Sequence, residues 1–81
     1  MISLQEAVRI AESYNSPFMP NFKARKIYDS KTYWSLIDTK LNLFTCSYYI
    51  HKKTGEVRGG SVPPFDWMDN VTDEDILVYE E

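Results

Sequence analysis

Cys46 and His51 are the only thiol and the only imidazole in this chain of 81 residues, so they form its one candidate nucleophile–base pair. Both belong to a segment, residues 43–52, whose alternating pattern predicts a β-strand. Five positions of extended chain place the two side chains on opposite faces and roughly 16 Å apart. Because a thiol nucleophile needs its base within hydrogen-bond reach, we expect a core cysteine and a solvent-facing histidine rather than a catalytic dyad.

The other polar residues offer little further chemistry. One histidine and one cysteine are too few for a zinc site, which takes four ligands. The acids Asp66, Asp69, Asp73 and Asp75 lack the regular alternation and the central glycine of a calcium loop. The glycine pair at 59–60 lacks the lysine and the following helix start of a phosphate-binding loop. We therefore expect a protein that is not an enzyme and holds no metal or cofactor.

Charge is divided unevenly along the chain. Residues 1–65, the basic body, carry all nine lysines and arginines and five acids, whereas residues 66–81, the acidic tail, carry seven acids and no basic residue. Where the two parts meet, residues 63–70 form an aromatic segment with the sequence Pro-Pro-Phe-Asp-Trp-Met-Asp-Asn. Prolines lower the entropy cost of ordering such a segment. Aromatic rings surrounded by acids are typical of an interface with a basic partner.

The sequence therefore favours a binding module that sequesters a basic protein partner through an acidic and aromatic surface. Phe65 and Trp67 are two positions apart and would share a face of an extended segment. The alternative is that these rings cover one edge of an undersized core, and both interpretations hold if one ring points inward and the other outward. The candidate partner-binding residues are Phe65, Asp66, Trp67, Asp69, Asp73, Glu74 and Asp75.

A second surface suggests nucleic acid as an alternative partner. Basic residues interleaved with aromatic ones are typical of a sheet that stacks bases and neutralises phosphates. The net charge of −3 and the acidic tail oppose phosphate binding. The residues of this candidate basic surface are Lys23, Arg25, Lys26, Lys31 and Tyr33.

Two further interpretations concern the acidic tail itself. In a self-assembling structural protein, the tail of one copy would dock on the basic body of another. Alternatively, the tail folds back on its own basic body. A large loss of stability on deletion of the tail would then indicate packing of Ile76, Leu77 and Tyr79, because surface ion pairs contribute little.

The elements that position these residues follow from hydrophobic periodicity. Ser3 and Glu6 form a capping box, and apolar residues at helical spacing predict a helix from Leu4 to Tyr14. The loop after it, residues 17–22, carries three apolar side chains that we expect beneath the helix: Phe18, Met19 and Phe22.

From residue 23 the period changes to two, which predicts strands at 23–29, 32–38 and 43–52. In the longest of these, apolar side chains alternate with polar ones, as in an antiparallel sheet covered on one side. Gly55 marks a tight hairpin, and a short strand that starts at Glu56 is broken by the glycine pair at 59–60. In the acidic C-terminal element, residues 71–81, Thr72 and the acids after it favour a short helix over an edge strand.

Composition is that of one ordinary globular domain, 1–81, with 43% hydrophobic and 15% aromatic residues. The predicted class is α+β, a two-layer fold with the N-terminal helix on an antiparallel sheet of three to four strands and a short C-terminal helix or strand. The single cysteine fits a reducing compartment. No signal peptide and no apolar run of about 20 residues is visible, so we expect a cytoplasmic protein without a membrane partner.

Several of these features occur in the order of a known family. A short amphipathic helix (4–14), a strand with Trp34, the sequence Tyr-Tyr-Ile-His-Lys at 48–52 with its turn Lys-Thr-Gly-Glu-Val at 53–57, and a closing segment 76–81 resemble the immunity protein 35 family of bacterial polymorphic-toxin systems. The resemblance covers most of the chain by spacing and implies a toxin as the sequestered partner. The turn also resembles PepSY domains, which are associated with inhibition of peptidases.

Overall fold

A capped helix opens the chain in the computed structural model, which describes residues 1–14, 21–40, 47–60, 62–68 and 75–81. Helix α1 spans Leu4–Ser13, and the Ser3 hydroxyl accepts a hydrogen bond from the backbone N–H of Glu6 at 3.2 Å. The Glu6 carboxylate contacts Arg9 at 3.2 Å. Ala7 and Ala11 are the buried residues of α1, so the helix approaches the sheet through its smallest side chains.

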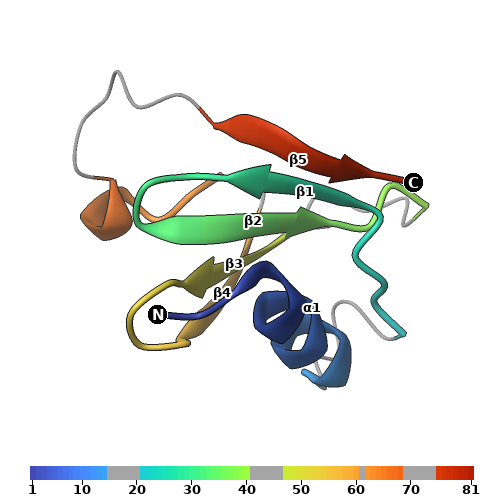
Figure 1. The fold of residues 1–81 in the computed structure, drawn as a ribbon, viewed down its shortest axis with the longest axis horizontal. Coiled ribbons are helices and arrows are strands. Elements are labelled where there is room, and N and C mark those ends of the chain that lie inside the picture. The colour runs from blue at the N-terminus through green and yellow to red at the C-terminus, as the bar shows by residue number, and fades with distance from the viewer. Residues whose placement is uncertain (15–20, 41–46, 61, 69–74) are drawn as a thin grey trace.

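Five antiparallel strands make one sheet in the order β4-β3-β2-β1-β5 (Figure 1). This confirms the α+β class, with more strands than the sequence predicted. The helix packs on β2 and β3. Strand β4 forms one border of the sheet and β5 forms the other. The strands are β1 (Lys26–Asp29), β2 (Tyr33–Ile37), β3 (Ser47–His51), β4 (Val57–Gly60) and β5 (Ile76–Glu80).

Two strand predictions were wrong in detail. The glycine pair at 59–60 does not break β4, because Gly59 and Gly60 pair with Tyr48 and Ser47 of β3 through the backbone alone. The C-terminal element is the strand β5 and not the favoured helix, because its backbone pairs with β1. Thr72, on which the helix prediction rested, lies outside the described residues, as does the first part of the predicted strand 43–52.

The main core lies between α1 and the sheet. Leu36, Tyr48 and Ile50 of β2 and β3 are at most 1% exposed and pack against the helix alanines. Phe22 belongs to the same cluster, which confirms its expected place beneath the helix, whereas Phe18 and Met19 lie outside the described residues. Gly55 has the positive φ of 74° that the hairpin prediction requires.

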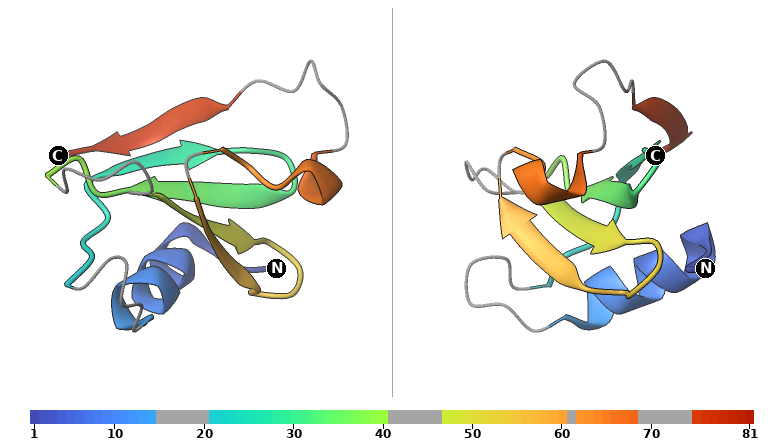
Figure 2. Two further views of the ribbon diagram at one scale, coloured as in Figure 1. Left: turned by 180° about the vertical axis from the view of Figure 1, so that it is seen from behind. Right: turned by 90° about the vertical axis from the view of Figure 1, so that its left-hand side faces the viewer.

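A second, smaller cluster covers part of the other face of the sheet. Trp67 belongs to a single turn of 3-10 helix, η1 (Phe65–Trp67), and packs with Tyr33 and Tyr49 while Met68 flanks them. Figure 2 shows η1 on the side of the sheet away from α1. The prediction of a sheet covered on one side was therefore wrong at Tyr49, which is 5% exposed.

Among the described residues, no helix combines the length and the apolar character needed to span a bilayer.

Candidate functional site

The turn η1 sends the two candidate aromatic rings in different directions. Trp67 is 5% exposed, whereas Phe65 is 88% exposed. In a 3-10 helix residues i and i+2 point to different sides, because one turn takes three residues. The backbone N–H groups of Trp67 and Met68 close the turn on the carbonyls of Pro64 and Phe65, at 3.1 and 3.2 Å. The prediction that this segment is extended was wrong. Of the two roles left open for the rings, Trp67 belongs to the core and Phe65 lies on the surface.

Arg58 of β4 ties this turn to the sheet. Its guanidinium lies 4.6 Å from the centre of the Trp67 ring and donates to both carboxylate oxygens of Asp66, at 2.8 and 3.0 Å. The same side chain donates to Glu56 at 2.6 Å. The hydrogen bonds from Arg58 hold the pKa of Asp66 below its ordinary value. Asp66 is therefore a charged anchor for the turn, and much of its charge is balanced within the chain.

The remaining acids of the predicted site are only partly in view. Asp75 is exposed just before β5, whereas Asp69, Asp73 and Glu74 lie outside the described residues. The described part of the predicted surface thus consists of the exposed Phe65 ring, the paired Asp66 and the exposed Asp75.

Two residues of the predicted basic surface, Arg25 and Lys26, contact the acidic tail. Lys26 contacts Glu80 of β5 at 3.6 Å, and Arg25 donates to Glu81 at 2.8 Å. Tyr33 is 3% exposed and belongs to the cluster around Trp67. The contacts follow the interpretation in which the tail folds back on its own body, and they leave Tyr33 no face on which a base can stack.

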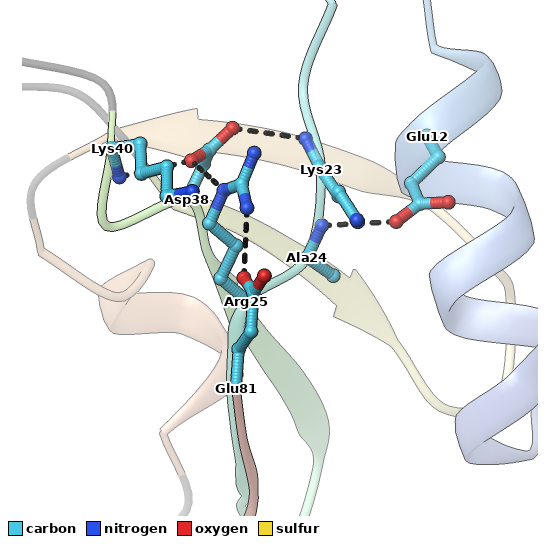
Figure 3. A network of polar contacts seen from close by, with 7 residues as sticks. All are labelled: Glu12, Lys23, Ala24, Arg25, Asp38, Lys40 and Glu81. Carbon is cyan, nitrogen blue, oxygen red and sulfur yellow. Dashed lines mark hydrogen bonds and ion pairs between the residues drawn. The ribbon is translucent and has the colours of Figure 1, made fainter.

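Arg25 also belongs to a network around a buried carboxylate, drawn in Figure 3. Asp38 accepts hydrogen bonds from the Arg25 guanidinium at 2.9 Å and from the backbone N–H groups of Lys23 and Lys40, each at 3.0 Å. Burial raises the pKa of Asp38, but these hydrogen bonds and the Arg25 charge outweigh burial and leave the pKa below its ordinary value. The hydrogen bond with Glu81 raises the pKa of Arg25. This network links residues at one end of the sheet to one another, and we interpret it as a structural site.

Lys31, the last residue of the predicted basic surface, lines a hollow at the other end of the sheet. The hollow has a volume of about 400 Å³. His51 belongs to its wall, and the His51 Nδ1 atom accepts hydrogen bonds from the backbone of Lys53 and Thr54 at 3.1 and 3.4 Å. Lys52 is paired with Asp29 of β1. The lining residues are Met1, Lys31, Thr32, His51, Lys52, Lys53 and Asp66.

Cys46 lies outside the described residues, so its distance from His51 stays a prediction. Within the described ranges, no three histidine, cysteine or acidic side chains gather as a metal would require.

The strand β5 is the surface feature that sequence reasoning missed. All of its residues are exposed, and Ile76, Leu77, Val78 and Tyr79 are 63%, 45%, 43% and 46% exposed. The signal was present as a run of four apolar residues between acids, but we considered Ile76, Leu77 and Tyr79 only as residues that would pack on the body if the tail folds back.

Comparison of the chain with protein-family models, with curated proteins and with solved structures found no match.

Proposed function

We propose that this protein is a non-enzymatic, cytoplasmic binding module that sequesters a protein partner and uses Phe65 as its anchor. The observation that carries the proposal is the presentation of Phe65, a phenyl ring 88% exposed on a turn held from beneath. Exposure of an apolar ring of this size to water is unfavourable in the free chain. In a complex, the same ring supplies contact area. The immunity-like resemblance suggests a toxin as partner.

Contacts within the chain hold the conformation of the turn, which would favour binding. Trp67 is buried beside Phe65, Arg58 holds Asp66 with two hydrogen bonds, and Pro64 fixes its own φ at −63°. A side chain on a rigid backbone loses less conformational entropy on binding than one on a flexible loop. These contacts support an anchor role for Phe65.

Acidic residues in the tail would attract a basic partner. The tail carries seven acids, of which Asp66, Glu80 and Glu81 contact cations of the chain itself. Asp75 is exposed, and Asp69, Asp73 and Glu74 lie outside the described residues. Exposed acids in the tail would raise the rate of encounter with a basic partner and make it sensitive to salt.

The test is a quantitative pull-down from a native lysate with the wild-type chain and the Phe65→Ala variant. Trp67 stays unchanged, because its truncation would disturb the fold. Ile76→Ala is the matched control, since Ile76 is also apolar and 63% exposed but lies on β5. A partner that is lost with Phe65→Ala and kept with Ile76→Ala supports the proposal. Equal recovery by all three chains contradicts it.

Once a partner is identified, its affinity for the purified chain should fall at least tenfold with Phe65→Ala, the range typical of an interface hot spot at about 1.4 kcal/mol or more. Isothermal titration measures this affinity, and stopped-flow kinetics at two salt concentrations should show an association rate that falls with added salt.

A further inference from the structure

We infer that β5 is a self-association edge through which two copies of this chain pair as a dimer. The starting observation is that β5 borders the sheet and has a neighbouring strand, β1, on one side. An edge strand presents unpaired backbone N–H and C=O groups to solvent, and these groups are a template for another strand. Figure 1 shows this edge at the border of the sheet opposite α1.

Apolar side chains flank the β5 edge on both faces of the sheet. Tyr79 pairs with Ile27, which belongs to the core beneath α1, so Tyr79 lies on the helix side. Leu77 pairs with Tyr28 and lies on the other side, while Val78 falls at an irregularity and has no partner in β1. Soluble proteins usually protect such an edge with lysines or a proline, but the only charges next to the apolar run are acids.

A second copy is the occupant that the two sheet edges favour. The opposite edge, β4, offers Arg58, already held by Asp66 and Glu56, and two glycines without side chains. Val57 of β4 packs against the core. Pairing of β5 with β4 would therefore bury little apolar surface and would produce an open chain of copies. Pairing of β5 with β5 buries apolar surface from both copies and closes as a two-fold dimer.

The charges at the ends of β5 permit this pairing. An antiparallel register that sets Ile76 opposite Tyr79 of the second copy keeps both side chains on the α1 side of the joint sheet. That register brings Asp75 near Glu80 of the second copy, whose carboxylate is already 3.6 Å from Lys26. Lys26 therefore partly balances the charge of Glu80 within each copy, which weakens the repulsion between Glu80 and Asp75.

The exposed area sets the expected strength. The exposed fractions of Ile76, Leu77, Val78 and Tyr79 amount to roughly 400 Å² per copy, about half of what each partner contributes to a standard interface. The dimer should therefore be weak, with a dissociation constant in the range of about 10 µM to 1 mM. The dimer forms at high local concentration, and Phe65 stays exposed in it.

Sedimentation equilibrium across this concentration range tests the inference on the whole chain. The Val78→Lys variant should raise the dissociation constant at least tenfold, because it places a charge at the centre of the paired strands. Phe65→Lys is the matched control: it changes the net charge by the same amount at an exposed apolar residue outside β5, and it should dimerise as wild type does. Circular dichroism establishes that each variant is folded, and Ile76→Lys replaces Val78→Lys if the latter is not.

Three results would overturn the inference. The first is a wild-type chain that stays monomeric up to about 1 mM, above the range expected for so small an interface. The second is a dimer that both β5 variants leave intact. The third is a dimer that dissociates as salt is added, which indicates docking of the acidic tail on the basic body of another copy, because apolar strand pairing persists at high salt.

Discussion

Truncation of Trp67 should lower stability far more than truncation of Phe65, although the two rings belong to the same turn. Replacing a buried tryptophan or phenylalanine by alanine costs about 3–5 kcal/mol. Trp67 is 5% exposed, but its cluster is small and η1 is a single turn, so we expect about 3 kcal/mol. Loss of the Arg58 contact adds roughly 0.5–1 kcal/mol. Phe65→Ala should change the unfolding free energy by less than about 0.5 kcal/mol, because its ring is exposed.

Equilibrium unfolding in urea, followed by circular dichroism, measures both effects. With a slope of about 1 kcal/mol per molar urea for a chain of this size, Trp67→Ala should lower the midpoint by about 3 M. The total stability of such a domain is roughly 4–12 kcal/mol, so this variant approaches the limit of folding. Trp67→Phe is the conservative control and should lose clearly less. A loss below about 1 kcal/mol for Trp67→Ala, or equal losses for both alanine variants, would refute the division into a core ring and a surface ring.

Two further predictions concern the buried carboxylate network. Asp38→Ala should lower the unfolding free energy by about 2–4 kcal/mol in urea titrations, because it leaves Arg25 and two backbone N–H groups without their acceptor. Asp66→Ala, which removes an exposed carboxylate, is the control. A loss for Asp38→Ala no larger than the loss for Asp66→Ala would contradict this prediction. The folded-state pKa values of Asp38, Asp66 and Glu81 are lowered, so their contribution is complete above the unfolded values near pH 4 and is lost as pH falls through the folded values. Unfolding free energies measured from pH 7 to 2 should therefore be level above about pH 5 and fall below about pH 4, and a stability that rises on acidification would disprove the assignment.

Local signals in the sequence predicted the elements that depend on local contacts. The Ser3 cap and the helical spacing gave α1 to within one residue of its end, and Gly55 gave the hairpin between β3 and β4. The C-terminal strand depends instead on distant pairing, since Arg25 and Glu81 are 56 positions apart. Signals near Thr72 favoured a helix, and β1 outweighs them by supplying backbone partners for β5.

The candidate site was predictable in kind but not in geometry. The aromatic segment indicated that Phe65 and Trp67 matter, and the possibility of one ring inside and one outside could be stated. Their assignment depends on the 3-10 turn and on Arg58, which reaches Asp66 across eight positions of the chain. No periodicity in the sequence reports such a contact, because it joins a strand to a single turn of 3-10 helix that is too short to show a repeat.

The exposed apolar surface of this fold follows from the size of its helix. A helix with side chains is about 10–12 Å wide and neighbouring strands lie about 4.8 Å apart, so one helix covers little more than two strands. Here α1 covers β2 and β3, and η1 covers part of the other face over Tyr33 and Tyr49. Ile27 of β1 still reaches the core beneath α1. Among the described residues neither α1 nor η1 packs extensively on β5, which explains why β5 is exposed on both faces. Because Phe65 lies on η1 and Val78 on this uncovered edge, a variant at either residue should leave the contacts of the other unchanged.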